Sequence, residues 1–301
     1  MKTGILAAAA LLAAAANATA ADLGAMKAPA PAPTAGSPWD YAFGAGIRSD
    51  YNFRGISQSD RGPGVFTYGE LRYNFAPNWQ GYVNVTGASV KLATRPSMEI
   101  DVSAGIRPTF GPLAFDFGAM AYLYPRETML QDVNLGGPPP LFALTPSNTD
   151  FFEVYGKATY TFNDMFSVGA GVYHSPNWLN LGATGTYVSG NAKINLPHGF
   201  AVSGELGRYF LGTTDLYLGA VNLPDYTYWN AGLSYKWKFA TLDLRYHGTS
   251  ANKNECWALT GDPRGASPLA TIAGNGSGRS RWCGDAFIAT LQFDLEAKDI
   301  R

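Results

Sequence analysis

Hydrophobic and polar residues alternate along the segment from Trp39 to Arg54. One parity carries Trp39, Tyr41, Phe43, Ala45, Ile47, Tyr51 and Phe53, and the other carries Asp40, Arg48, Asp50, Asn52 and Arg54. Because side chains of a strand point alternately to opposite faces, this pattern predicts a long β-strand with one apolar face. Strands of soluble proteins average about five or six residues, whereas a bilayer-crossing strand needs roughly ten. The segment therefore favours a strand that spans a membrane.

Similar runs follow one another to the C-terminus, with no helical period between them. They are Val65–Phe75, Trp79–Ser89, Met98–Phe110, Leu113–Tyr124, Phe152–Phe162, Phe166–His174, Tyr187–Leu196, Phe200–Phe210, Thr227–Trp237, Ala240–Thr249 and Phe287–Leu295. We therefore predict an all-β fold, a transmembrane antiparallel up-and-down β-barrel of about twelve strands. The count is least secure between His174 and Phe210, where ten or fourteen strands in total also fit.

The predicted connections alternate in length. Short turns fall at residues 76–78, 111–112, 163–164, 197–199 and 238–239, and long loops at 55–64, 91–97, 125–150, 175–180, 211–225 and 250–285. Outer-membrane barrels have short periplasmic turns and longer extracellular loops. This alternation predicts a protein of the cell outer membrane with both termini in the periplasm.

Aromatic residues gather beside both kinds of connection and predict two girdles at the membrane interfaces. The short-turn set is Trp39, Phe75, Trp79, Phe110, Phe162, Phe166, Phe200, Trp237 and Phe239. The long-loop set is Tyr51, Phe53, Tyr122, Tyr124, Phe152, Tyr173, Trp178, Tyr226 and Tyr246.

The N-terminus predicts export. Residues 1–20 combine one Lys, an apolar stretch and a small-x-small site, which is typical of a signal peptide. Residues 21–38 form a Pro/Ala-rich periplasmic leader, and residues 39–301 form a single barrel domain. With 22 basic and 23 acidic residues, the chain is nearly neutral, which argues against a nucleic-acid partner.

Cys256 and Cys283 are the only cysteines, and both lie in the last long loop. In an oxidising compartment the simplest interpretation is a disulfide, which would restrict the unfolded loop by roughly 3 to 4 kcal/mol. A metal site is the rival interpretation. It is disfavoured because that loop contains no histidine, and we expect neither metal nor cofactor.

Strand parity directs a mixed set of charges into the lumen. These candidate pore-lining residues are Arg48, Asp50, Arg54, Glu70, Arg72, Glu99, Asp101, Arg107, Asp116, Glu153, Lys157, Glu205, Asp243 and Arg245. Two interpretations stay open: the charges brace one another across a packed barrel, or they set the field of a water-filled pore. Twelve strands lie between the filled eight-stranded barrel and the open sixteen-stranded porin, so the strand number is compatible with a narrow pore and does not require one.

The segment SDYNFRGISQSD, residues 49–60, resembles a motif of the TorF family of putative porins, which are proteobacterial outer-membrane proteins. Shorter stretches are similar too: Glu99–Asp101, Tyr124–Pro125, Phe152–Gly156, His174–Pro176 and Leu244–His247. The resemblance implies a porin-like barrel and supplies no substrate. Within the motif, Arg54 points into the mouth and acts either as a latch against a neighbouring carboxylate, the favoured interpretation, or as a solute contact.

An enzyme is not expected. His174 and Ser175 lie at the height of the outer girdle, where some barrels hydrolyse lipids, but adjacent residues of a strand point apart. The chain is therefore expected to be a pore for passive diffusion of small polar solutes or ions. A structural or surface-interaction barrel with an occluded lumen is the alternative, and a lipid-modifying enzyme is a weaker one.

The expected partners are outer-membrane lipid and lipopolysaccharide, the barrel-assembly machinery and small polar solutes. The sequence ends without the terminal aromatic residue usual for outer-membrane barrels, and we expect Phe293 with Leu295 to serve as the assembly signal. The loop from Pro125 to Asp150 carries three consecutive prolines and several apolar residues. We expect this loop either to fold into the mouth and limit the pore, or to stay exposed and bind a neighbour.

Overall fold

The computed structural model describes residues 37–128, 148–265 and 278–300. Within these ranges, twelve strands close into one antiparallel barrel in which each strand pairs with its neighbours in sequence, and β1 pairs with β14. The barrel strands are β1 (Trp39–Arg48), β4 (Gly64–Ala76), β5 (Trp79–Ala88), β6 (Glu99–Phe110), β7 (Leu113–Leu123), β8 (Phe151–Thr161), β9 (Phe166–Ser175), β10 (Gly185–Asn195), β11 (Phe200–Leu211), β12 (Tyr226–Trp237), β13 (Ala240–Thr249) and β14 (Ala286–Glu296). The predicted fold class and strand number are confirmed.

The remaining elements are short. They are the strands β2 (Asn52–Phe53) and β3 (Ile56–Ser57), the 3-10 turns η1 (Trp178–Asn180), η2 (Pro197–Gly199) and η3 (Leu216–Leu218), and the helices α1 (Lys253–Thr260) and α3 (Ala297–Ile300). No helix in the described ranges is both long and apolar enough to cross a membrane.

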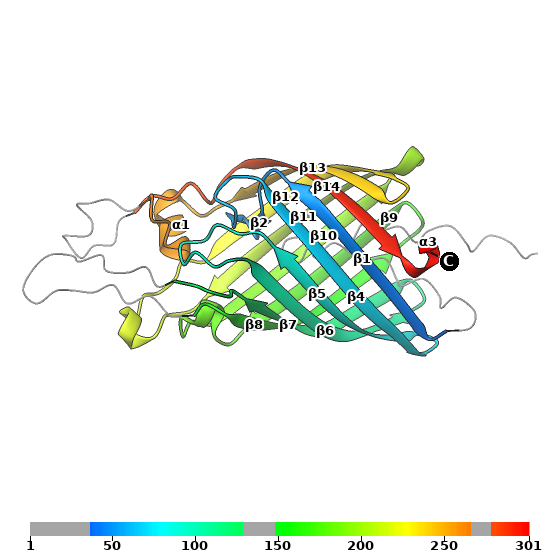
Figure 1. Cartoon of the computed structure of the whole chain (residues 1–301), viewed down its shortest axis with the longest axis horizontal. Coiled ribbons are helices and arrows are strands. Elements are labelled where there is room, and N and C mark those ends of the chain that lie inside the picture. Colours follow the sequence, from blue (N-terminus) through cyan, green and yellow to red (C-terminus); the bar gives the residue numbers. More distant parts are fainter. Residues whose placement is uncertain (1–36, 129–147, 266–277, 301) are drawn as a thin grey trace, which may run out of the picture.

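The connections alternate as predicted, which defines two ends of the barrel. The turns after β4, β6, β8, β10 and β12 are short, and those after β1, β5, β7, β9, β11 and β13 are long. Figure 1 shows the tilted strands, with α1 and β2 at the long-loop end and α3 at the other end, called here the short-turn end. Strand β1 begins at the short-turn end, and strand β14 ends there.

Apolar side chains cover the outer face of the wall. Val65, Leu71 and Phe75 of β4 are about half exposed, whereas Glu70 and Arg72 between them are buried. The same alternation holds in β6, where Val102 faces outward and Asp101 and Ser103 face inward. The predicted short-turn girdle is also present, since Trp39, Phe110, Phe162 and Trp237 among others are exposed.

The first strand is shorter than predicted. It ends at Arg48, and the chain then turns into the barrel, where it forms the β2–β3 hairpin. Tyr51 and Phe53 are therefore buried inside, although the alternation placed them on the lipid face. A bend at Ser49 and Asp50 ends the strand, so the alternation of faces also ends there. The hydrophobic pattern continues past this bend and therefore does not predict it.

The predicted girdle at the long-loop end is wrong in most of its members. Tyr122, Tyr124, Trp178 and Tyr226 are all buried, while Phe152 does face outward. Closeness to a long loop does not decide which face of a strand an aromatic residue occupies. Tyr122 shares the parity of Asp116 on β7, and parity alone directs both side chains inward.

Several predictions fall on residues outside the described ranges. These are the signal peptide, the leader up to residue 36 and the central part, residues 129–147, of the proline-rich loop. The division of the chain into these segments stays a prediction.

Candidate functional site

The candidate site is the lumen together with the segment that enters it, residues 50–62, called here the plug. Its tip is a two-residue hairpin in which Asn52 pairs with Ser57 and Phe53 with Ile56. The two central residues, Arg54 and Gly55, have φ of 47° and 90°. Positive φ at both positions is the requirement of a type I′ hairpin turn, and a non-glycine residue rarely accepts it. Contacts made by the Arg54 side chain therefore hold this turn in place.

Arg54 reaches across the lumen to β8. Its Nη1 and Nη2 donate to Oε1 and Oε2 of Glu153 at 2.6 and 2.8 Å, and both side chains are buried. The hydroxyls of Tyr122 and Tyr209 donate to the same carboxylate at 3.0 and 3.2 Å. Four hydrogen bonds on one buried carboxylate satisfy it well.

Aromatic rings complete the surroundings of Arg54. Its guanidinium carbon lies 4.7 Å from the ring centroids of Phe53 and Tyr173, 4.4 Å from that of Tyr187 and 5.0 Å from that of Tyr209. All four distances are within the range of cation–π attraction. The latch interpretation of Arg54 thus agrees with its contacts in the structure.

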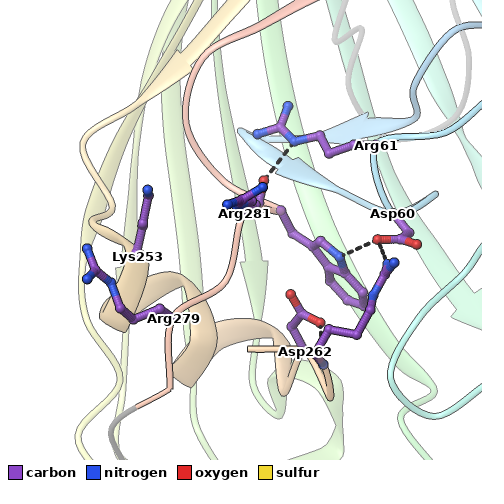
Figure 2. A pocket seen from close by; sticks show the side chains of 8 residues that line it. Asp60, Arg61, Lys253, Asp262, Arg279 and Arg281 are labelled. Atoms are coloured by element: carbon purple, nitrogen blue, oxygen red, sulfur yellow. Dashed lines mark hydrogen bonds and ion pairs between the residues drawn. The ribbon is translucent and has the colours of Figure 1, made fainter. Parts of the chain in front are cut away.

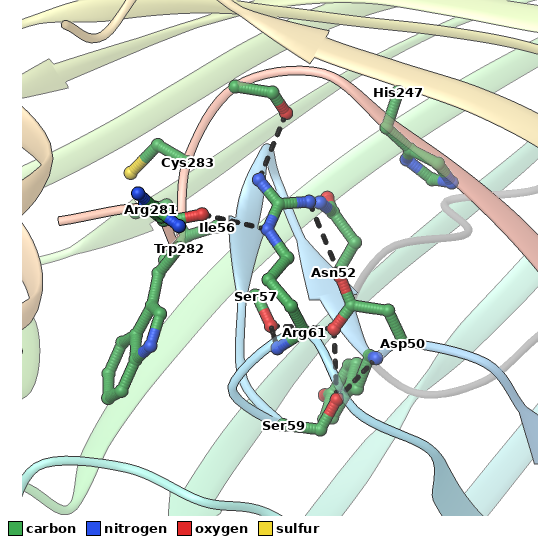
Figure 3. Close-up of polar contacts among 12 residues, drawn as sticks. Asp50, Asn52, Ile56, Ser57, Ser59, Arg61, His247, Arg281, Trp282 and Cys283 are labelled. Atoms are coloured by element: carbon green, nitrogen blue, oxygen red, sulfur yellow. Dashed lines mark hydrogen bonds and ion pairs between the residues drawn. The ribbon is translucent and has the colours of Figure 1, made fainter. Parts of the chain in front are cut away.

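A second anchor holds the base of the plug (Figure 3). Asp50 accepts hydrogen bonds from the hydroxyls of Ser57 at 2.6 Å and Ser59 at 2.9 Å, and pairs with Arg61 at 3.4 Å. Ser59 Oγ also accepts from the backbone N–H of Tyr51 at 2.8 Å. The serines of the SDYNFRGISQSD motif therefore serve the fold of the plug itself.

The cysteine-bearing loop packs on the plug from the long-loop end. It contains the predicted disulfide between Cys256 and Cys283. The backbone N–H of Ser57 donates to the carbonyl of Trp282 at 2.7 Å, and Ile56 forms a β-bridge with Cys283. The indole N–H of Trp282 donates to Asp60 at 3.0 Å. The disulfide therefore constrains the loop segment, Trp282 and Cys283, that contacts the plug.

A cavity of about 600 Å³, called here the mouth pocket, opens where the plug meets the cysteine-bearing loop. Asp60 and Arg61 of the plug line it, and Trp282 lies in its wall. Its other lining residues come from α1 and from the segments on either side of residues 266–277. Sequence reasoning gave no role to these residues, because their proximity depends on the tertiary fold.

Two further candidates, Glu99 and Asp101, lie close together beneath Tyr51. The Tyr51 hydroxyl donates to Glu99 at 2.5 Å, and the guanidinium of Arg48 stacks 3.4 Å over the Tyr51 ring. Burial and the two carboxylates raise the pKa of Tyr51 above its usual value, so its hydroxyl stays a donor. Both carboxylate oxygens of Asp101 are buried without a hydrogen-bond partner among the described residues.

Toward the short-turn end, the predicted charges pair along the wall. Arg72 bonds Asp40 at 3.0 Å and Glu70 at 2.5 Å. Arg107 pairs with Glu70 at 3.0 Å and with Asp116 at 3.4 Å, and Lys157 pairs with Asp116 at 3.0 Å. This chain of ion pairs runs from β1 to β8 and stiffens that wall.

The opposite wall carries a smaller polar cluster. Arg245 pairs with Asp243 at 2.9 Å and donates to Asn230 at 2.6 Å, and Tyr187 donates to Glu205 at 2.5 Å. Mutual bracing, one of the two interpretations of the charged set, therefore applies to most of these groups.

At the level of the plug, the whole cross-section is filled. Every barrel strand contributes an inward side chain that is at most 6% exposed: Arg48, Phe66, Thr86, Asp101, Tyr122, Glu153, Ser175, Tyr187, Tyr209, Tyr228, His247 and Ile288, in strand order. In a water-filled lumen these side chains would be accessible. Nearer the short-turn end, Lys157 is 27% and Asp243 17% exposed, as expected of a hydrated vestibule.

The His174–Ser175 pair does not form a catalytic arrangement. His174 is exposed, and its Nδ1 lies 2.9 Å from the hydroxyl of Thr186. Ser175 is fully buried on the other face of the strand. The two side chains point apart, as strand geometry requires.

A model of a family described as "Bacterial protein of unknown function (Gcw_chp)" matches residues 32–264. The chain belongs to this family. The TorF resemblance noted from the motif is not itself shown by this match, and no curated protein matches the chain in sequence.

Among solved structures, the NanC porin is 11% identical over 85% of this chain and 100% of that chain, with a TM-score of 0.46. The KdgM porin is 12% identical over 84% and 98%, with a TM-score of 0.42. OmpT, an outer-membrane protein of Vibrio cholerae, is 10% identical over 88% and 100%, with a TM-score of 0.42.

Proposed function

We propose that this family member is a porin-like barrel of the outer membrane that passes small polar solutes or ions, and that the conformation described here is its closed state. The observation that carries the proposal is the closed twelve-stranded wall with apolar side chains outside and charged groups inside. Such a wall satisfies its backbone hydrogen bonds internally and presents a lipid-compatible surface. The long-loop end is then extracellular, and both termini are periplasmic.

The plug supports the idea of a closed but openable path. It is a single segment, not part of the wall, and its own hairpin ladder is only two residues long on each strand. Arg54, Asp50 and the loop around Trp282 hold it. Withdrawal of residues 52–57 would connect the partly exposed charges of the vestibule with the outside. The candidate pore-lining residues would then act in two zones, Lys157 and Asp243 in the vestibule and Glu99, Asp101 and Glu153 at the gate.

A permanently occluded structural barrel is the second candidate. The filled cross-section at the level of Glu153 favours the occluded barrel. The buried inward side chains of the twelve strands would have to become hydrated for solutes to pass. In both cases outer-membrane lipid, lipopolysaccharide and the barrel-assembly machinery are the proposed partners. Phe293, exposed on β14, lies in the C-terminal strand that such machinery would engage.

Single-channel recording in planar bilayers separates the two candidates. Asn52–Ser57 is replaced by two glycines, which can bridge the gap because Gln58 N lies 2.6 Å from the carbonyl oxygen of Tyr51. The control removes Leu216–Gly219 from another long loop, where Ala220 N lies 3.1 Å from Asp215 O. We expect stepwise, salt-dependent conductance from the shortened plug, and wild-type behaviour from the control. A folded plug variant that stays silent beside a conducting control porin would establish the occluded barrel instead.

A further inference from the structure

The mouth pocket concentrates positive charge. Five of its lining residues are cationic: Arg61, Lys253, Arg264, Arg279 and Arg281. Asp60 and Asp262 are its acidic lining residues, so the lining has a formal excess of three positive charges, whereas the whole chain has a net charge of −1. Residues 266–277, which join two parts of the lining, contain no charged residue and bring no further carboxylate.

The two acidic groups are already engaged. Asp60 accepts from Trp282 and pairs with Arg264, and Asp262 accepts from the hydroxyl of Ser280 at 2.8 Å. Arg61 is also used, since it donates to the carbonyls of Arg281 and Gly284 at 2.9 and 3.2 Å. Protein contacts therefore account for the carboxylates and for two of the five cations.

Lys253, Arg279 and Arg281 are different. Within the described part of the chain, their side chains have neither an ion pair nor a hydrogen bond from the charged group. Figure 2 shows Lys253 and Arg279 on one side of the pocket, with Asp60 and Asp262 on the other. Lys253 and Arg279 also line a neighbouring cavity of about 630 Å³, whose only acidic lining residue is Asp285. Their donors thus face open space and not a carboxylate.

The surrounding structure fixes the backbone that carries these three cations. Lys253 opens α1, whose start is held by the reciprocal hydrogen bonds of Asn252 and Glu255. Arg279 and Arg281 flank Ser280, whose backbone N–H donates to the carbonyl of Lys253 at 2.9 Å. The disulfide ties both segments together, three residues after Lys253 and two residues after Arg281. The backbone that carries these exposed cations is therefore held in place, which reduces the conformational freedom that is lost when a ligand binds.

We propose that the mouth pocket binds an anionic group of the phosphate class. Guanidinium forks and a lysine ammonium match several oxygens of a tetrahedral anion at once. The cavity exceeds the size of one phosphate, so its ligand is a phosphorylated sugar or a phosphorylated lipid headgroup at the same position. Because Asp60 and Arg61 belong to the plug, a bound anion would join the plug to the cysteine-bearing loop. Binding of an anion does not require a conducting lumen, so the test of this proposal is independent of whether the protein forms a pore.

The test compares the folded wild-type chain in neutral detergent with the triple variant K253Q/R279Q/R281Q. The matched control is K91Q/R95Q/R126Q, which removes three exposed cations from other loops at the same end. Inorganic phosphate and glucose 6-phosphate are titrated by calorimetry at low salt. We expect binding by wild type and control, and about tenfold weaker binding by the triple variant, because each exposed charged contact contributes modestly.

A second arm identifies the source of the anion. The same three proteins are immobilised in neutral detergent and incubated with lipopolysaccharide or with phosphatidylcholine, and the lipid retained after washing is measured. Loss of lipopolysaccharide retention by the triple variant alone, without soluble phosphate binding, supports a lipid headgroup as the ligand. Equal behaviour of the triple variant and the control in both arms, or no binding by the wild type in either arm, overturns the proposal. Heat-modified gel mobility verifies that each variant is folded.

Discussion

Arg54 and Glu153, 99 residues apart in sequence, form a two-pronged ion pair in the centre of the barrel. Their side chains are 3% and 0% exposed. A buried ion pair contributes little net stability compared with an apolar pair, but removal of one partner leaves an uncompensated charge. The pair therefore acts mainly as a device for placing the plug, and its single variants should be worse than its double variant.

We expect Arg54→Ala to destabilise the barrel by about 3 kcal/mol, because it leaves the buried carboxyl group of Glu153 without its cationic partner. The double variant R54M/E153M should recover part of this loss and no more, because it leaves the buried hydroxyls of Tyr122 and Tyr209 without their acceptor. Urea unfolding in detergent, followed by tryptophan fluorescence, measures both. Arg208 and Asp225, 3.8 Å apart and well exposed, supply the control pair. Arg208→Ala should change the free energy of unfolding by less than about 1 kcal/mol.

Added methylguanidinium should partly restore the stability of Arg54→Ala. The vacated site keeps a carboxylate and the rings of Tyr173, Tyr187 and Tyr209, which suit a guanidinium ion. Sodium at equal concentration is the reference for ionic strength. Indistinguishable unfolding midpoints in the two salts would show that the site formed by the carboxylate and the three tyrosine rings collapses when the arginine side chain is lost.

The outer wall is the part of the fold that the sequence predicts best. The period of two is a local property, so β4 or β6 can be assigned without knowledge of its neighbours. The alternation of short and long connections then gives the topology. The same rule failed at Tyr51, because the strand ends at Arg48 and the chain turns into the lumen. At Tyr122 parity gives the inward face correctly, whereas closeness to a long loop gives the wrong one.

The candidate site was predicted only in part. Parity placed Glu153 and Arg107 inside, and the motif pointed to Arg54, but which charges pair depends on barrel curvature and on the path of the plug. Lys253 and Arg281 line the same pocket only because a disulfide holds two loop segments together. No periodic pattern in the sequence predicts that residues of these two segments lie close together.

Adjacent residues of β12 test the assignment of faces. Leu233 is 43% exposed on the outer side, and Ser234 faces the lumen opposite Asp243. Leu233→Arg should reduce folding into lipid vesicles, since an arginine on the lipid face near the midplane costs about 2 to 4 kcal/mol. Ser234→Arg should fold normally, because it meets Asp243 in a partly hydrated space. Equal folding yields for both variants would refute the assigned faces.

The tip of the plug depends on Gly55. Its φ is 90°, and a Cβ atom there would lie 2.9 Å from Cβ of Thr249. We expect Gly55→Ala to destabilise the plug by about 1 to 2 kcal/mol through strain and contact together. Gly69→Ala is the control, because a Cβ at Gly69 meets no atom within 4 Å. Hydrogen exchange of the Ser57 amide reports the opening of the plug, and unchanged protection in Gly55→Ala would contradict the prediction.

Removal of the disulfide should weaken the attachment of the plug without changing any residue of the plug. Cys256 and Cys283 are 27 residues apart in sequence, and a closure of this length stabilises a loop by roughly 3 to 4 kcal/mol on the chain-entropy estimate. Trp282, which accepts the hydrogen bond of Ser57, directly precedes Cys283. The variant C256S/C283S should therefore leave the barrel folded and increase the frequency of channel opening, and reduction of the wild type should have the same effect. The control is C256S/C283S treated with the same reductant, which should not respond further. If reduction changes thiol labelling but leaves the opening frequency as it was, the loop does not hold the plug.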